Sequence, residues 1–288
     1  MKAWFLAIRP QTLAAGICPV LIGTVLTLAN HQFVFFPVAA ALLGAIFIQI
    51  GTNLTNDYFD FKKGADTPER VGPTRVTQSE LIKPKTVLGG VFIAFGLAVL
   101  CGLYLVYKAG FPVVVIGVLS LLSGFFYTAG PRPLAYLGLG DIFAFVFFGP
   151  VAVAGTVYVQ TLHLSTTAVV AGIAPGLFSV ALLTVNNLRD HDQDLKAHKK
   201  TLIVRFGQFF GKTEYTLAIL GASLIPPILI LASGAHHRAL IASFGVLIAS
   251  IPVFGIILHE TGPRLNEALG STSKLLLLYT LLFCAGWL

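Results

Sequence analysis

Residues 34–54 read VFFPVAAALLGAIFIQIGTNL, and residues 55–66, which follow directly, read TNDYFDFKKGAD. The first stretch has the length and composition of a helix that crosses a lipid bilayer. The second stretch places three carboxylates, Asp57, Asp60 and Asp66, at the end of that helix. Charged side chains beside the hydrocarbon region are costly and are retained mostly where they have a function. The boundary between the two stretches therefore predicts a membrane-spanning helix that ends in a polar site.

The composition extends this prediction to the whole chain. Of its 288 residues, 56% are hydrophobic and 11% are charged, whereas soluble domains carry roughly a quarter charged residues. The apolar runs of spanning length are 12–30, 34–54, 86–107, 111–128, 139–160, 166–187, 216–234, 238–258 and a short last run, 274–288. We therefore expect an all-α polytopic membrane protein with about nine transmembrane helices, forming a single transmembrane domain over residues 1–288.

A second acidic stretch resembles the first. Residues 186–194 read NNLRDHDQD and follow the apolar run 166–187. If both helices continue to their first acids, Asp57 and Asp60 lie three residues apart and Asp190 and Asp194 lie four apart, so each pair shares a helical face. Carboxylate and amide oxygens suit Mg²⁺, which commonly binds one or two carboxylates together with substrate phosphate oxygens. The two stretches therefore predict a pair of clusters that hold a diphosphate through Mg²⁺.

The distribution of charge predicts the orientation in the membrane. All of the 19 Lys and Arg except Lys108 and Arg238 fall in the N-terminal segment or in the loops after even-numbered runs. The positive-inside rule places those segments in the cytoplasm. All 12 Asp and Glu fall on the same side, which that rule does not require, and this indicates a polar site facing the cytoplasm. We expect a multi-pass protein of the cell (inner) membrane, in contact with membrane lipid. Its N-terminus and active-site loops are expected to be cytoplasmic.

Several motifs resemble the UbiA-type superfamily of intramembrane aromatic prenyltransferases. One motif is Asn56–Asp60 with Asp66, and another is Asp190 with Asp194. The stretches GPTRVTQS (72–79) and GPRPL (130–134) are similar to the branch that prenylates 1,4-dihydroxy-2-naphthoate. The resemblance implies a helix bundle around a central cavity open to the cytoplasmic side. It also implies transfer of a polyprenyl group from polyprenyl diphosphate to 1,4-dihydroxy-2-naphthoate in menaquinone biosynthesis, with loss of CO₂ and diphosphate.

Roles for individual residues follow from the motifs together with this resemblance. The expected Mg²⁺ ligands are Asn56, Asp57, Asp60, Asp190 and Asp194. These carboxylates and Asp66, as a base or as a residue behind the ligands, make the expected catalytic set. Substrate contacts are expected from Asn53, Asn56, Lys63, Arg75, Tyr127, Arg132, Asn187, Lys199 and Lys200. Among these, Arg132, Lys199 and Lys200 are the candidates for the diphosphate, and Tyr127 and Arg75 for the border of the acceptor.

Other functions receive less support from the sequence. Intramembrane acids also mark ion-coupled transporters, but those carry polar groups near the midplane and access from both sides. Another aromatic acceptor, such as 4-hydroxybenzoate, haem or a chlorophyllide, is the alternative within the superfamily. The basic residues are divided among membrane loops, which gives no support for nucleic-acid binding, and no feature indicates an obligate protein partner.

Two residues depart from the pattern of the superfamily. Glu80 and His198 stand where glycine is more usual. Because glycine permits backbone angles that other residues resist, these positions test whether the loops keep the same conformation.

Overall fold

The computed structural model describes residues 2–66 and 71–288, which form helices and no strands. The long helices are α2 (Pro10–Ala29), α3 (Phe35–Lys62), α4 (Pro84–Ala109), α8 (Thr166–Arg189), α11 (Gln208–Ser233), α12 (Leu240–His259) and α13 (Leu265–Trp287). The shorter ones are α1 (Lys2–Ile8), α5 (Phe111–Phe126), α6 (Gly140–Val146), α7 (Ala152–Thr161), α9 (His191–Lys196) and α10 (Leu202–Phe206). A π-helical turn, η2 (Phe147–Val151), joins α6 to α7, and the 3-10 turns are η1 (Leu134–Leu137), η3 (His237–Ala239) and η4 (Gly262–Arg264).

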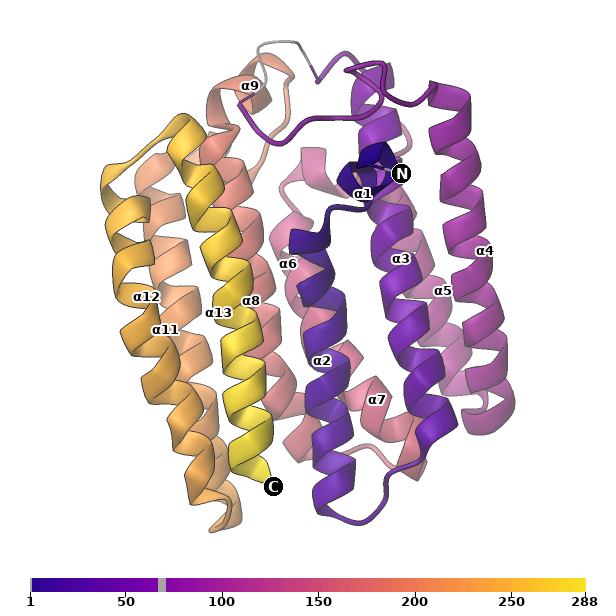
Figure 1. Ribbon diagram of the computed structural model, residues 1–288, viewed down its shortest axis with the longest axis vertical. Helices are drawn as coiled ribbons and strands as arrows, with labels where there is room; N and C mark the ends of the chain where they lie inside the picture. The colour runs from indigo at the N-terminus through magenta and orange to yellow at the C-terminus, as the bar shows by residue number, and fades with distance from the viewer. Residues whose placement is uncertain (1, 67–70) are drawn as a thin grey trace.

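The helices confirm the expected all-α membrane architecture. Within the described residues, 8 helices are long and apolar enough to cross a membrane, counting Gly140–Thr161 as one of them. The run predicted over 111–128 forms α5, which has 16 residues and is shorter than the others. The N-terminus and the C-terminus lie at opposite ends of the bundle (Figure 1). The chain is thus a multi-pass membrane protein.

Two predicted spans begin earlier than the apolar pattern indicates. The span predicted from residue 216 is the helix α11, which begins at Gln208, and the short one predicted from residue 274 is α13, which begins at Leu265. Polar residues interrupt the apolar pattern near the start of both helices, Lys212 and Glu214 in α11 and Asn266 and Glu267 in α13, so a search for apolar runs begins after them. In α11 the Lys212 ammonium donates to the backbone oxygen of Leu258 at 2.7 Å, so polar residues extend the helix beyond its apolar part.

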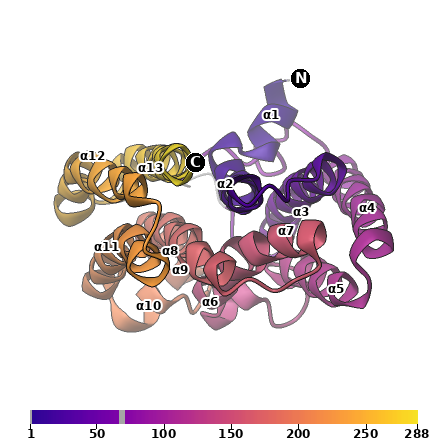
Figure 2. The same cartoon turned by 90° about the horizontal axis from the view of Figure 1, so that it is seen from below.

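Neighbouring helices form a ring when the bundle is viewed along its long axis (Figure 2). Helices α2, α3, α4 and α5 follow one another along one side, and α8, α11, α12 and α13 follow along the other. Helix α13 packs against α2, so the last helix closes on the first long one. The segment α6–η2–α7 contacts α8 on one side and α2 on the other. This arrangement encloses a cavity lined mainly by residues of α2, α3, α4, α5, α6, α7 and α8.

The most buried helix, α8, is lined with small residues. They include Ala168, Ala171, Ala174 and Ala181, none of which exceeds 1% exposure. Within a bilayer the solvent is itself apolar, so helices associate through close packing, and small side chains allow their backbones to approach. Phe178 of α8 then packs against Tyr279 of α13 with their ring centroids 5.4 Å apart. The close packing of α8 therefore fixes the position of its C-terminal end, where the second acidic stretch begins.

A kink in the α6–η2–α7 segment depends on glycine. Gly149 has non-helical angles (φ −119°, ψ −111°), and Pro150 has no backbone N–H to offer, so the helix is interrupted here. A β-carbon on Gly172 of α8 would lie 2.6 Å from the Pro150 Cα, and one on Gly176 would lie 2.6 Å from the Phe145 oxygen. Only glycine allows this close approach, which brings Phe147 and Phe148 toward the enclosed space.

Candidate active site

A cavity of about 850 Å³ occupies the enclosed space. Its wall includes residues of α2, α3, α4, α5, α6, α7 and α8. Charged and amide side chains gather at the end near α9, whereas α4, α5 and α7 contribute a mostly apolar wall with a few hydroxyl groups. The cavity therefore has one polar end and one long apolar part, as an amphipathic ligand requires.

The polar stripe of α3 follows helical spacing. Residues Gln49, Asn53, Asn56 and Asp60 recur every three or four positions, share one face of the helix and line the cavity. Asn53 is held by its amide, which donates to the Ile8 backbone oxygen at 2.8 Å and to the Thr12 hydroxyl at 2.9 Å. The stripe leads directly to Asp60, whose side chain is 0% exposed.

The second acidic stretch lies across the cavity. Helix α8 ends at Arg189, and α9 begins immediately after Asp190. The backbone N–H of Asp194 donates to the Asp190 oxygen at 2.8 Å, so a helical turn continues through the break. Asn187, Asp190 and Asp194 all line the cavity. The expectation that each acidic pair shares a face therefore holds for Asp190 and Asp194.

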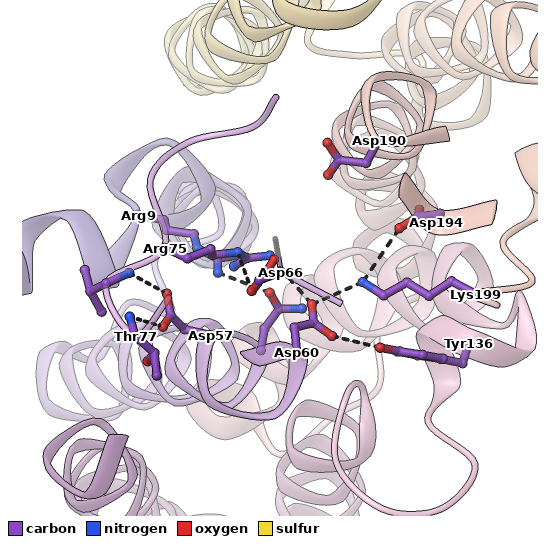
Figure 3. A network of polar contacts seen from close by, with 12 residues as sticks. Arg9, Asp57, Asp60, Asp66, Arg75, Thr77, Tyr136, Asp190, Asp194 and Lys199 are labelled. Carbon is purple, nitrogen blue, oxygen red and sulfur yellow. Dashed lines mark hydrogen bonds and ion pairs between the residues drawn. The ribbon is translucent and has the colours of Figure 1, made fainter. Parts of the chain in front are cut away.

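Asp60 connects the two clusters (Figure 3). Its Oδ2 accepts a hydrogen bond from the Lys199 ammonium at 3.1 Å and lies 3.7 Å from the Arg75 guanidinium. Its Oδ1 accepts from the Tyr136 hydroxyl at 3.2 Å. Lys199 also lies 3.7 Å from Asp194 Oδ1, so one ammonium bridges carboxylates of both stretches.

The environment sets the charge of this network. Burial acts to lower the pKa of Lys199, but the carboxylates of Asp60 and Asp194 outweigh it and the pKa is raised. Burial and then the charge of Asp60 raise the pKa of Tyr136, so its hydroxyl stays protonated and donates a hydrogen bond to Asp60. The polar end of the cavity thus contains a charged lysine between acids.

Asp57 and Asp66 do not line the cavity. Both carboxylate oxygens of Asp57 accept hydrogen bonds from backbone N–H groups, one from Val76 at 3.1 Å and one from Thr77 at 2.9 Å. Asp66 Oδ2 lies 3.3 Å from the Arg75 guanidinium. Asp66 therefore sits behind Arg75, and Asp57 faces the 71–82 loop.

Arg189 fixes the position of Asp190. Its guanidinium donates to both carboxylate oxygens, at 2.8 Å and 2.7 Å, in a bidentate pair. It also donates to the Asn266 side chain at 3.0 Å, and Asn266 donates to the Val71 backbone oxygen at 3.1 Å. The ends of α8, α13 and the 71–82 loop are thereby joined around the polar end of the cavity.

The structure separates the residues predicted to bind substrate into two groups. Those that line the cavity are Asn53, Asn56, Arg75, Tyr127, Asn187 and Lys199. Lys63, Arg132 and Lys200 do not line it, and Arg132 and Lys200 are exposed. The Lys63 ammonium instead donates to the backbone oxygens of Thr128 and Gly130, at 2.8 Å and 3.2 Å. Burial lowers the pKa of Lys63, with opposing contributions from neighbouring charges.

The residues of the cavity wall or its polar network that the sequence did not indicate include Arg9, Tyr136 and Arg189. Arg9 has a left-handed backbone (φ 54°) just before Pro10, and its guanidinium donates to the Asn56 side chain at 3.1 Å. In the sequence, Arg9 was notable for its position just before the first spanning run, and that position was used only to predict the orientation in the membrane. Tyr136 lies in the 3-10 turn η1 and had no local signal. Arg189 stands within the second acidic stretch and could have been expected there.

Both departures from the family pattern keep a left-handed backbone. The φ angles are 58° for Glu80 and 55° for His198. These two loops therefore retain the conformation that glycine favours, at a cost of roughly 1–2 kcal/mol for each residue with a β-carbon.

Comparison with known proteins agrees with this geometry. The sequence model described as the UbiA prenyltransferase family matches residues 16–278. The chain belongs to the UbiA prenyltransferase family. It is 36% identical over 250 residues to the 1,4-dihydroxy-2-naphthoate octaprenyltransferase of Mycobacterium tuberculosis, covering 87% of this chain and 85% of that protein. It is 33% identical to the protein of the same name from Haemophilus influenzae, covering 100% of this chain and 96% of that protein.

A solved UbiA structure shares the fold. The structure of a UbiA homolog from Archaeoglobus fulgidus bound to DMAPP and Mg²⁺ gives a TM-score of 0.68 at 14% identity. The superposition covers 98% of this chain and 99% of that one. The UbiA architecture thus extends over nearly the whole length of both proteins.

The donor set of this UbiA protein fits Mg²⁺. Within residues 2–66 and 71–288, no three His, Cys, Asp or Glu side chains come together as a metal site by themselves. The carboxylates of Asp60, Asp190 and Asp194 and the amides of Asn56 and Asn187 nevertheless line the same cavity. Mg²⁺ retains waters and takes phosphate oxygens from its substrate, so it does not need a complete protein cage. These oxygen donors suit an ion that arrives with a diphosphate.

Proposed function

We propose that this protein transfers a polyprenyl group from polyprenyl diphosphate to 1,4-dihydroxy-2-naphthoate, with Mg²⁺ as cofactor and with loss of CO₂ and diphosphate. The product, a demethylmenaquinone, belongs to menaquinone biosynthesis. The observation that carries the proposal is a single cavity with carboxylates and cations at one end and apolar walls beyond them. The names of the two relatives support the choice of acceptor.

The diphosphate would bind at the polar end. Asp60 on one side and Asp190 with Asp194 on the other would hold Mg²⁺, with Asn56 beside Asp60. Lys199 and Arg75 supply positive charge at the same end, and both are largely buried. Positive groups in a water-poor site stabilise charge that develops on a leaving group far more than they do in water. When bound, Mg²⁺ adds to this by neutralising charge on the leaving diphosphate.

The prenyl tail would lie along the apolar wall. Gly102 and Val106 of α4, Gly117 and Leu121 of α5, and Phe148 of η2 line this part of the cavity. Apolar walls exclude water, which would otherwise capture the allylic carbocation formed when diphosphate leaves. The same walls bring the first carbon of the tail to the polar end, where the acceptor ring attacks it.

Tyr127 is placed to border the acceptor. It lies just after α5 and lines the cavity. Burial raises its pKa, and the charges of Asp141, Asp194 and Asp60 raise it further, so the hydroxyl remains protonated. A protonated hydroxyl donates a hydrogen bond to an oxygen of the acceptor and orients the ring. Asp66, behind Arg75, would act through that arginine.

The orientation in the membrane is part of the proposal. The loops that carry the acids and most of the Lys and Arg lie at one end of the bundle, together with the N-terminal helix α1 (Figure 1). The positive-inside rule supports a cytoplasmic position for this end in the cell membrane. The match over residues 16–278 supports one prenyltransferase domain over the chain.

The test is a product assay in membranes that contain the protein. Prenyl diphosphates of several lengths are combined with 1,4-dihydroxy-2-naphthoate, 4-hydroxybenzoate or another aromatic acceptor, with Mg²⁺ or EDTA, and products are identified by mass spectrometry. We expect a decarboxylated prenyl naphthoate product that requires Mg²⁺ and is lost in D60N and D194N. A product from 4-hydroxybenzoate alone would refute the acceptor, and full turnover by D60N would refute the metal site.

A further inference from the structure

Asp57 belongs to the acidic stretch but faces away from the cavity. Its residue exposure is 1%, and it does not contribute to the cavity wall. Its two carboxylate oxygens are each occupied by a backbone donor of the 71–82 loop: Oδ2 by the Val76 N–H at 3.1 Å and Oδ1 by the Thr77 N–H at 2.9 Å. Hydrogen bonds to an ionised acceptor are about twice as strong as neutral ones. The carboxylate is therefore committed to the loop.

Asp57 and Asp60 have different partners although they lie only three residues apart on α3. At about 100° per residue their side chains are about 60° apart, which places Asp57 at the edge of the stripe that Asn53, Asn56 and Asp60 form along the cavity, where the 71–82 loop reaches it. In Figure 3, Asp57 points toward Thr77, whereas Asp60 lies between Arg75 and Lys199. The two acids of one motif thus contact different parts of the chain.

The loop that Asp57 holds is a compact turn. The backbone N–H of Ser79 donates to the Arg75 oxygen at 3.0 Å, that of Glu80 to the Thr77 oxygen at 3.2 Å, and that of Ile82 to the Val76 oxygen at 3.1 Å. Val76 is 0% exposed and Thr77 is 1% exposed. Because the turn is closed by its own hydrogen bonds, fixing two successive N–H groups fixes its position on α3.

Arg75 immediately precedes the two residues that Asp57 holds. Its guanidinium lies 3.3 Å from Asp66 Oδ2 and 3.7 Å from Asp60 Oδ2, and it lines the polar end of the cavity. An arginine presented from a loop reaches such a position reproducibly only if the backbone beside it is fixed. The carboxylate of Asp57 supplies this fixed point.

We propose that Asp57 is a positioning residue that anchors the 71–82 loop to α3 and thereby presents Arg75 to the diphosphate, rather than a ligand of Mg²⁺. The role rests on the proposed prenyl transfer, since it assigns a function to Arg75 in that site. It gives the two acids of the first motif separate tasks. Asp60 faces the ion and the substrate, and Asp57 holds the loop that covers them.

The variant D57N tests this assignment, because an amide retains one acceptor oxygen and replaces the other with a donor that faces an N–H group. The loss of one buried charge-assisted hydrogen bond predicts a KM for prenyl diphosphate raised by about tenfold to a hundredfold. The Mg²⁺ concentration that gives half-maximal activity should remain within about twofold of the wild-type value. The variant R75Q should show the same increase in KM, and D57N/R75Q should be no worse than R75Q.

A second measurement does not depend on activity. The Arg75–Val76 bond is buried in the anchored loop, so trypsin should cut it slowly in the wild-type protein and faster in D57N, with the cleaved bond identified by mass spectrometry. D60N is the matched control, and it should lose turnover while its Arg75–Val76 bond stays protected. A tenfold higher Mg²⁺ requirement in D57N with unchanged cleavage would overturn the proposal and make Asp57 a ligand. Full turnover by D60N would instead refute the proposed function.

Discussion

Replacing Lys199 with Met removes the ammonium between the two acidic stretches and keeps most of the side-chain length. In the wild-type protein the ammonium lies 3.1 Å from Asp60 Oδ2 and 3.7 Å from Asp194 Oδ1. The Asp60 side chain is 0% exposed, so water does not replace the lost partner. The K199M protein therefore carries a buried carboxylate that has lost its nearest cation.

The expected cost follows from what remains around Asp60. Breaking a buried ion pair by removing one partner typically costs about 3–5 kcal/mol. The Arg75 guanidinium at 3.7 Å and the Tyr136 hydroxyl at 3.2 Å still contact the carboxylate, so we expect the lower end, about 3 kcal/mol. The pKa of Lys199 is raised, so its contribution is fully present below the unfolded lysine value and is lost only as the pH rises through the folded one. The difference between wild type and K199M should thus be constant from about pH 7 to about pH 9.

Thermal unfolding in detergent without Mg²⁺ measures the effect. A loss of about 3 kcal/mol corresponds to a fall in Tm of roughly 6–12 °C for a chain of this size. K200M is the matched control, because the neighbouring lysine is exposed and lies outside the cavity wall, and its Tm should stay close to that of the wild type. Saturating Mg²⁺ should narrow the gap, because no ammonium competes for the acids of K199M, which therefore bind the ion more tightly and gain more stability from it than those of the wild type. Equal Tm values for K199M and wild type without Mg²⁺ would refute the reasoning.

Three further predictions follow from backbone geometry and from the cavity wall. G172A should destabilise the protein by about 1–3 kcal/mol in chemical unfolding, because the added β-carbon would lie 2.6 Å from the Pro150 Cα, whereas G155A, with no atom within 4 Å, should not. E80G should stabilise it by up to about 1 kcal/mol, because φ is 58° and glycine relieves the strain, and E80A should give no such gain. G117F should reduce turnover of long prenyl diphosphates far more than of dimethylallyl diphosphate in the product assay, and equal loss for both would count against a tail in this part of the cavity.

The membrane fold could be predicted because its signals are local. Apolar runs of spanning length give the helices, and the acids that follow two of them indicate where a polar site lies. Helix ends were less predictable, as the polar residues near the start of α11 and α13 show. The contact of Lys212 in α11 with the Leu258 oxygen joins distant parts of the chain, which composition does not reveal.

The site could be predicted only as far as helical spacing allowed. Asp60 and Asp194 face the cavity as expected, whereas the direction of Asp57 depends on a loop about twenty residues away in sequence. Lys199 and Lys200 are adjacent and chemically alike, yet only Lys199 reaches the acids. The backbone here is held by hydrogen bonds from the Lys199 N–H to the Asp194 oxygen and from the Lys200 N–H to the Tyr136 oxygen, and the second of these joins distant parts of the chain.

The division of the cavity into a charged end and an apolar remainder also affects how the reaction ends. In the proposed reaction, one product is a small multivalent anion and the other is a lipid-soluble quinol. The first would be drawn to water at the loop end, while the second would partition into the surrounding bilayer along the walls of α4 and α5. Because the products enter different phases, neither accumulates beside the other at the site of transfer. In the proposed reaction, the partitioning of the two products between water and the bilayer thus favours forward turnover.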